Sequence, residues 1–423
     1  MAIKTSWTAG EVLTAADLTD TFANKAGLTP ISSQTITAGT ATVKPLILRA
    51  ASGQTANLLE FQNSAGTAVR AVLPDGTITG QNLLYNGAMQ VAQRSTSVAS
   101  ITTGGYYTAD RFVTDITTLG TWTQSVENDA PTGSGLRKSL KMLCSTADGS
   151  PAAGDILSIA QSLEGQDLQR IRKGTSDATQ MTLSFWVKSN VTGTYTVLVF
   201  DNDNSRATSF AYSISASATW ERKTILIPAD TTGALDNDNA ASLTVFFCLG
   251  AGSNFTSGSL QATWASYTAA NRAVGQVNLA AAINNYWQIT GVQLEVGPVA
   301  SPFDFKPYGQ ELRECERYYK VFDSDGQTDR GMINGVAYLN NQILAALTWS
   351  RMRAAPTATV SNSTQVDVVT GGVVTTANNT LAGSNLTPTS AQMAVNNTGT
   401  PFTQGHGAVI RFDGASLALA AEL

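Results

Sequence analysis

Between residues 81 and 310 the chain repeats one pattern, short runs in which apolar and polar residues alternate. In the clearest run, apolar Leu183, Phe185 and Val187 are separated by single residues of the other face. An alternation with a period of two predicts a strand that buries one face. Further runs share this character at 194–200, 210–214, 224–227, 243–249 and 286–296. Because no amphipathic helical pattern interrupts them, the sequence predicts a mainly β protein with a β-sandwich over 81–310.

The charge balance of the chain argues against a nucleic-acid-binding function. Only 13% of the 423 residues are charged, and the net charge is −5 without a basic cluster. Because phosphate binding needs clustered Lys or Arg, we expect no nucleic-acid partner. Hydroxyl and amide side chains take the place of charges, and such a surface suits extended β-structure and subunits that pack together. The length predicts about two to four domains.

The cysteines and the apolar runs bear on cellular location. Cys144, Cys248 and Cys315 lie far apart without metal spacing, which disfavours a disulfide framework and a zinc site. No run resembles a signal peptide, and the longest apolar stretches, such as 244–249, are too short to span a membrane. We therefore expect assembly in a reducing cytoplasm, no membrane insertion, and release by a route other than secretion.

The N-terminal segment predicts a short helix. Thr14 is a good N-cap, and Asp17 completes a capping-box-like pair. Leu13 and Leu18 have the spacing of a hydrophobic staple, and Phe22 shares a face with Leu18. The helix has too little apolar surface to stand alone, so it must dock on its own trimer mates or on a partner.

Residues 28–80 predict thin β-structure. Residues 63–66 read as a hairpin turn, and Pro74, Asp75 and Gly76 form a second turn in which glycine supplies a positive φ. Three short strands are too few for a stable monomeric domain. Three copies wound together would be stable, because each would bury its apolar face on the others.

Beyond residue 307 the pattern predicts one short helix and a second β-region. The helix begins near Tyr308 and places Leu312, Cys315 and Tyr319 on one face. Strands are expected within 332–346, with a break near 340–341, in a hairpin over 366–374, and last at 391–395 and 408–412. The sequence thus predicts a smaller β tip domain.

Several segments resemble the fibre proteins of tailed bacteriophages. Residues 7–18, WTAGEVLTAADL, resemble the N-terminal adaptor of many phage fibre and appendage proteins, and residues 58–78 resemble the repeat of their trimeric shafts. Residues 83–94, LLYNGAMQVAQR, and residues 107–112 resemble the opening of a jelly-roll domain in phage fibres. The end of that domain type is matched by segments at 287–297, 302–305 and 314–319. The jelly roll is similar to carbohydrate-binding modules of the kind appended to glycoside hydrolases. No pattern is recognised after about residue 355.

Residues that carry catalytic or metal chemistry are sparse. The one histidine, His406, lies in a turn before a strand, and we interpret it as structural. Acids lie mostly in turns instead of facing each other across a cleft, which disfavours glycan cleavage. The Asp-Asn-Asp-Asn runs at 201–204 and 236–239 lack a full calcium loop, so we interpret them as turns. Asp110 and Arg111 are interpreted as a structural ion pair. We expect no enzymatic activity, no metal and no cofactor.

Aromatic residues are the candidate ligand contacts, because sugars stack their apolar faces on exposed rings. Trp186 shares its strand face with polar neighbours, and Trp220 begins a strand beside Glu221. Trp264 and Tyr267 lie in a long, weakly patterned segment. Each of these four rings could instead pack against a second sheet, a loop or a trimer neighbour.

The sequence therefore predicts four parts: a virion-attachment segment over 1–27, a trimeric β shaft over 28–80, a jelly roll over 81–310 and a β tip over 311–423. Attachment residues are predicted at Trp7, Leu13, Leu18 and Phe22. We hypothesise a homotrimeric tail fibre of a phage virion that binds other virion proteins through its N-terminus and contacts the host surface, through glycans or a protein. The alternatives are a head fibre or tail decoration without a receptor role, a glycan-cleaving tail spike, and a carbohydrate-binding module of a cellular enzyme.

Overall fold

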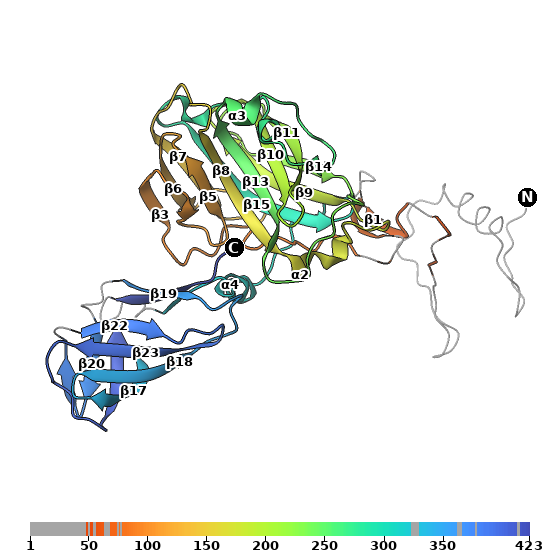
Figure 1. Ribbon diagram of the computed structural model, residues 1–423. Helices are drawn as coiled ribbons and strands as arrows, with labels where there is room; N and C mark the ends of the chain where they lie inside the picture. Colours follow the sequence, from red (N-terminus) through yellow and green to blue (C-terminus); the bar gives the residue numbers. More distant parts are fainter. Residues whose placement is uncertain are drawn as a thin grey trace, which may run out of the picture.

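The computed structural model shows a mainly β protein with a large sandwich and a smaller β domain (Figure 1). It describes residues 48–49, 51–53, 56–62, 68–73, 76, 78–322, 330–361, 366–376, 379–412 and 415–423. The predicted N-terminal helix and the attachment residues Trp7, Leu13, Leu18 and Phe22 lie outside these residues. None of the described helices is long and apolar enough to cross a membrane.

The large sandwich consists of two antiparallel sheets. The seven-stranded sheet contains, in spatial order, β14 (Ala265–Ser266), β11 (Arg206–Ile214), β10 (Gly193–Asp201), β13 (Ala241–Ala251), β8 (Ile156–Glu164), β5 (Val113–Thr117) and β4 (Gly105–Tyr106). The six-stranded sheet contains β12 (Glu221–Ile227), β9 (Met181–Ser189), β15 (Tyr286–Val296), β7 (Ser139–Thr146), β6 (Thr121–Glu127) and β3 (Ser97–Ile101). Short helical turns lie in the connections: α2 (Gly165–Leu168), η1 (Gln169–Ile171), α3 (Ser253–Thr256), η2 (Ala269–Asn271) and η3 (Leu279–Ala281).

The alternation seen in the sequence builds the sandwich core. Leu183, Phe185 and Val187 of β9 are all 0% exposed, as the pattern predicted. The Phe185 ring meets the ring of Phe247 on β13 of the other sheet, with centroids 5.1 Å apart and an edge-on geometry. Such a buried ring contributes about 3–5 kcal/mol to folding. The strands expected at 194–200, 210–214, 224–227, 243–249 and 286–296 are confirmed as β10, β11, β12, β13 and β15.

The C-terminal domain has its own core and its own sheets. A seven-stranded sheet contains β21 (Val373–Thr375), β20 (Val366–Thr370), β24 (Gly407–Phe412), β17 (Arg330–Leu339), β18 (Gln342–Thr348), β23 (Ser390–Asn397) and β22 (Asn379–Ser384). A three-stranded sheet contains β16 (Tyr319–Phe322), β25 (Ser416–Ala420) and β19 (Thr357–Ser361). The predicted break after 339 and the hairpin at 366–374 are confirmed, and Gly371 and Gly372 turn the hairpin with φ of +55° and +82°.

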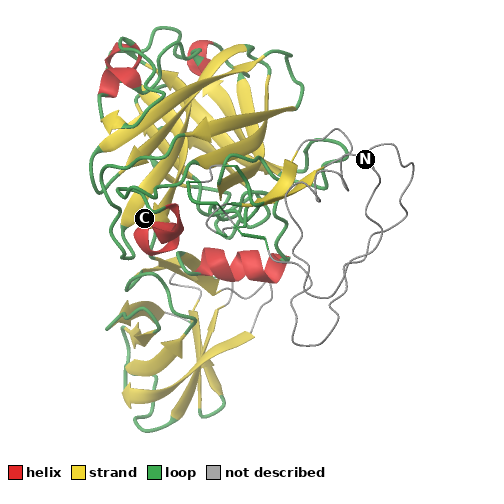
Figure 2. Ribbon diagram, turned by 90° about the vertical axis from the view of Figure 1, so that its right-hand side faces the viewer, coloured by secondary structure: helices red, strands yellow, loops and turns green. Residues whose placement is uncertain are grey.

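Two expectations for this region are wrong. The last strand is β25, because its apolar residues Leu417 and Leu419 are needed to close the second core. The helix α4 (Tyr308–Glu316) ends before Tyr319, which instead begins strand β16. Figure 2 shows α4 between the two β bodies. Tyr319 begins β16 because it pairs with Ala420 in the C-terminal sheet.

A hairpin precedes the sandwich. Strands β1 (Leu59–Gln62) and β2 (Ala68–Val72) pair antiparallel, and Leu73 joins the sandwich core. The hairpin leaves apolar side chains exposed at Leu59, Phe61 and Ile78. The predicted trimeric shaft remains a prediction, and the described part of it is this hairpin.

A buried carboxylate joins the two domains. Glu164, at the end of β8, is 0% exposed, and Arg317 donates to both of its oxygens at 2.7 and 2.6 Å. The Tyr318 hydroxyl donates a third hydrogen bond of 2.5 Å. Burial raises the pKa of Glu164, but the bonds from Arg317 and Tyr318 outweigh it and hold the pKa below the usual value. The residues that follow α4 are thereby fixed to the sandwich.

The sequence interpretation of Asp110 and Arg111 as a mutual ion pair is wrong. The buried Arg111 guanidinium donates instead to Glu422, one residue from the C-terminus, and lies 3.4 Å from the centre of the Tyr318 ring. Asp110 accepts hydrogen bonds from the backbone and side chain of Gln93. Arg111 thus pairs with a residue far along the chain, whereas Asp110 is bonded by Gln93 and lies 3.8 Å from the guanidinium of the neighbouring Arg94.

Changing Glu164 to Gln should destabilise the junction. Removing one member of a buried ion pair leaves the other charge uncompensated and costs about 3–5 kcal/mol. Calorimetry should show a lower melting temperature for this variant. The matched control is Glu316→Gln, which removes only the partly exposed ion pair with Lys320, a change of less than about 1 kcal/mol. Equal losses in both variants would contradict the role given to Glu164.

The effect of Glu164 should also depend on pH. Its folded pKa lies below its unfolded value, so its stabilisation is present above the unfolded pKa and is lost as pH falls through the folded pKa. The difference in unfolding free energy between the protein and Glu164→Gln should therefore shrink in acid. Denaturant titrations at several pH values measure this difference, and a gap that widens as pH falls would contradict the assignment.

Candidate functional site

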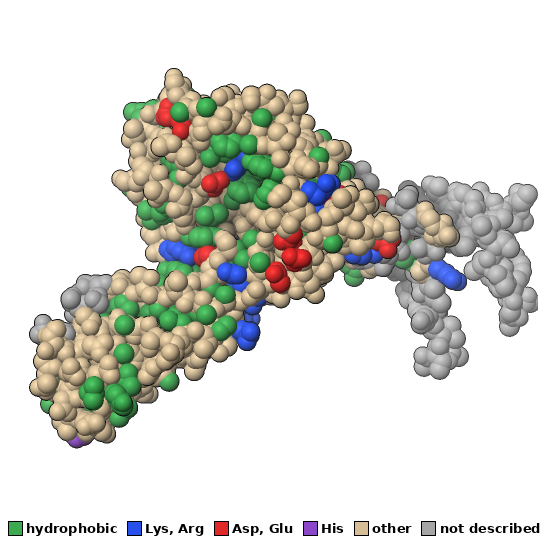
Figure 3. All heavy atoms as spheres, viewed as in Figure 1, with side chains coloured by type: hydrophobic (Ala, Val, Ile, Leu, Met, Phe, Trp, Pro, Cys, Tyr) green, Lys and Arg blue, Asp and Glu red, His purple; other side chains and the backbone are tan. Residues whose placement is uncertain are grey.

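The outer face of the seven-stranded sheet carries a partly exposed aromatic ring. Figure 3 shows hydrophobic side chains gathered over the central strands of this sheet, with few charges among them. The outward positions of β8 are small and buried, namely Ser158, Ala160 and Ser162. On the neighbouring β13 the outward position is a ring, Phe246, which stays partly exposed. Because Ser158 and Ala160 are 0% exposed, Phe246 is the residue of these positions that a ligand can reach.

The ion pair between Arg272 and Asp115 lies beside the Phe246 ring. The guanidinium carbon of Arg272 lies 4.5 Å from the centre of the Phe246 ring, and Arg272 donates to Asp115 at 2.7 Å. Arg272 also donates to the Ser158 hydroxyl at 3.1 Å, while its Nε is buried without a partner. The Asp115 side chain is 37% exposed, so it can still accept hydrogen bonds from outside. We call Phe246, Arg272 and Asp115 the Phe246 face.

Two of the four predicted sugar contacts lie beside this sheet. The rings of Tyr267 and Phe200 meet edge-on at 5.1 Å, and Phe200 points outward on β10. The indole of Trp264 donates to the carbonyl of Pro228 at 2.8 Å, and the Lys173 ammonium lies 4.9 Å from its ring. Trp264 is thus anchored in a loop, whereas Tyr267 borders the open face.

The other two predicted contacts lie on the six-stranded sheet. Trp220 donates to Asp129 at 3.3 Å, and its ring lies 5.0 Å from the Lys188 ammonium. Lys188 and Asp129 form an ion pair, so this tryptophan is held in a charged cluster. Trp186 lines a small hollow on the same sheet face. The structure therefore separates the four rings into two pairs on different sheets, and their role as sugar contacts remains a prediction.

Carboxylates of the Asp-Asn-Asp-Asn runs at 201–204 and 236–239 bind or lie close to other groups of the protein. The buried Asp201 pairs with the Lys173 ammonium, which also bonds the carbonyl of Gly233 and lies 3.0 Å from Asp230. Asp203 accepts a hydrogen bond from the backbone of Asp236. Within the described ranges no three His, Cys, Asp or Glu side chains are grouped to hold a metal ion. The Lys173 ammonium lies where a metal ion bound by Asp201 and Asp230 would have to lie.

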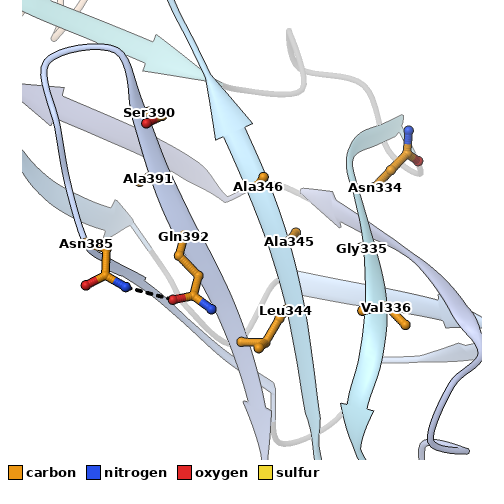
Figure 4. Close-up of a pocket in the computed structure, with 10 residues that line it drawn as sticks. All are labelled: Asn334, Gly335, Val336, Leu344, Ala345, Ala346, Asn385, Ser390, Ala391 and Gln392. Carbon is orange, nitrogen blue, oxygen red and sulfur yellow. Dashed lines mark hydrogen bonds between the residues drawn. The ribbon is translucent and has the colours of Figure 1, made fainter.

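The C-terminal sheet carries a second open hollow of about 470 Å³ (Figure 4). Val336 and Leu344 line it together with small residues, and Asn385 donates to Gln392 at its rim at 2.9 Å. The lining includes no aromatic ring and no charged group. Because its lining has no aromatic ring and no charged group, this hollow provides fewer contacts for a sugar than the Phe246 face does.

Comparison with known proteins gives only distant similarities. No family model and no curated protein sequence matches the chain. Among solved structures, it is similar to the enzymatically active domain of tailspike protein 4 of bacteriophage CBA120, at 16% identity and a TM-score of 0.28, over 51% of this chain and 21% of that chain. It is also similar to the family 11 carbohydrate-binding module of cellulase Lic26A-Cel5E of Clostridium thermocellum, at 8% identity and a TM-score of 0.25, over 51% and 95% of the two chains.

A third similar structure is the N-terminal cellulose-binding domain of β-1,4-glucanase C of Cellulomonas fimi. Its identity is 12% and its TM-score 0.24, over 42% of this chain and 85% of that domain. At these scores the likeness carries no functional argument, and the function has to be inferred from the residues of the site.

Sequence reasoning missed the Phe246 face. The signal for Phe246 was present, because the alternation that sends Val245 and Phe247 inward sends Phe246 outward. For Arg272 no such signal exists, since it follows η2 in a long connection without periodicity. Its position over Phe246 is fixed only by folding.

Changing Gly291 to Ala should disturb Trp186. Gly291 has a φ of +60°, and a Cβ there would lie 2.8 Å from Cδ1 of Leu136 and 3.1 Å from Cδ1 of Trp186. The left-handed backbone alone costs alanine about 1–2 kcal/mol. We expect a lower melting temperature and a shifted tryptophan emission. The control is Gly309→Ala, where a Cβ has open space, and an unchanged emission for Gly291→Ala would show that the contact is not required.

Proposed function

We propose that this chain is a homotrimeric fibre-type structural protein of a tailed-phage virion, and that its jelly roll binds host-surface glycans without cleaving them. The resemblance of residues 7–18, 58–78 and 83–94 to phage fibre segments supports the virion assignment. The N-terminal segment would attach the protein to other virion proteins.

The observation that carries glycan binding is the Phe246 face. A partly exposed ring stacks against the apolar side of a sugar, and Asp115 accepts hydrogen bonds from its hydroxyls. Arg272 holds Asp115 in place and donates from the same position. A largely apolar surface with a few fixed polar groups is the usual composition of a small-molecule site.

The hairpin before the sandwich supports association of several copies. Leu59 and Phe61 lie on one face of β1, at 38% and 53% exposure, and Ile78 is 56% exposed. Two strands alone are marginally stable in water, and burial of these side chains on neighbouring copies would stabilise them. Three weak sugar contacts on one rigid body then act together, and avidity raises binding about a hundredfold or more.

A head fibre or tail decoration without a receptor role is the main alternative. It would need the same attachment segment, hairpin and sandwich, so these elements do not distinguish the two functions. The Phe246 face is the feature that the receptor role would use and the decoration role would not.

Adsorption competition tests the proposal. Purified full-length protein, added in excess to host cells before the phage, should reduce phage adsorption. The variants Phe246→Ala and Asp115→Asn should compete at least about tenfold less well, the loss expected when about 1.4 kcal/mol of contact energy is removed. Ile283→Ser is the control, since Ile283 is 60% exposed in a distant loop.

The possible results separate the two functions. Competition by the protein and by Ile283→Ser, but not by the Phe246 face variants, would support glycan contact through this face. If folded, trimeric protein leaves adsorption unchanged, the receptor role is wrong and the decoration alternative takes its place.

A further inference from the structure

The small hollow beside Trp186 lies on the outer face of the six-stranded sheet. It has a volume of about 200 Å³ and is lined by Ser134, Leu136, Ser184, Trp186, Arg222, Gly291, Pro302, Phe303 and Phe305. The residues come from β9, β12, β15 and the segments at 134–136 and 302–305. Pockets for drug-sized ligands have volumes of about 300–1,000 Å³, so this hollow suits one sugar unit.

Three aromatic rings form the walls of this hollow. Phe303 and Phe305 meet edge-on, with ring centroids 5.0 Å apart, and Phe305 is 49% exposed. Trp186 stands on β9 beside Gly291, which has no side chain to displace it. Gly135 leaves similar room for Phe305, since a Cβ there would lie 3.1 Å from its Cζ. The rings are therefore held by close packing against backbone.

The only charged group in the lining is Arg222. It is exposed and donates one hydrogen bond of 2.8 Å, to the carbonyl of Ser301. Among the residues that the structure describes, no carboxylate forms an ion pair with it, whereas Arg272 and Arg317 each bind an acid. A guanidinium has five donor N–H groups, and most of those of Arg222 remain available to a ligand. The hollow thus combines aromatic walls with an uncompensated positive charge.

We propose that this hollow binds a carboxylated sugar unit, such as a hexuronate, within an acidic host glycan. Trp186 and Phe303 would contact the apolar side of the sugar ring. The Arg222 guanidinium would bind the carboxylate through two parallel hydrogen bonds, the geometry that arginine provides and lysine does not. The inference rests on the proposed contact with host glycans, and it adds a site on the sheet opposite to the Phe246 face, with a stated chemistry.

The test compares two ligands that differ only in the charged group. Methyl glucuronide and methyl glucoside are each added to the full-length protein, and binding is followed by saturation-transfer NMR. We expect the glucuronide to bind at least tenfold more tightly than the glucoside, and its affinity to fall as salt is raised. Equal binding of the two ligands, or binding of neither, would overturn the proposal.

Variants assign the binding to the hollow. Arg222→Gln should abolish the preference for the glucuronide, Arg222→Lys should restore part of it, and Trp186→Ala should weaken both ligands. Ile283→Ser is the control, because Ile283 is 60% exposed and belongs to neither this hollow nor the Phe246 face, and it should leave glucuronide binding unchanged. Loss of binding in Phe246→Ala but not in Arg222→Gln would move the site to the other sheet and contradict the inference.

A final measurement separates sugar binding from contact between copies. If Arg222→Gln dissociates the oligomer in sedimentation while the glucuronide has no effect on the protein, the hollow is a subunit contact and the proposal fails. The proposed function is tested separately, because its adsorption competition is read with the Phe246 face variants, in which Arg222 is unchanged. Either result can therefore fail without the other.

Discussion

The buried carboxylate of Glu164 is the interaction on which the arrangement of the two domains depends. A charge without access to water must be paired, and this one is bonded by Arg317 and Tyr318 from the segment just after α4. The same segment supplies the ring that lies over Arg111, whose guanidinium binds Glu422 near the C-terminus. The end of the sandwich, the linking helix and the C-terminal tail are thus tied together at one place.

This junction lies at one end of the sandwich and does not involve the residues of the two candidate sites. It occupies the end of β8 and the residues around Arg94 and Arg111, which bind the C-terminal tail. The Phe246 face lies on one sheet and the Arg222 hollow on the other, and neither contains a junction residue.

Much of the fold could be predicted from local pattern. The alternation at Leu183, Phe185 and Val187 correctly gave a strand, its buried face and the outward direction of Trp186. The same reasoning failed at Tyr319, which was assigned to a helix but begins β16. It also missed β25, whose pairing partners β16 and β19 lie far away in the sequence. Pairing between strands that are far apart in the sequence cannot be recognised from a short window of residues.

For the candidate sites, the sequence by itself determined which residues could contact a ligand. It selected Trp186, Trp220, Trp264 and Tyr267 from ring chemistry and strand position, and it showed a chain of few charges. Only the tertiary structure decided what surrounds each ring: a carbonyl and an ammonium at Trp264, and Arg222 with two phenylalanines at Trp186. The reason is that residues close in sequence lie on one strand, whereas a binding surface is formed across strands and loops whose contacts arise from burial of the shared core.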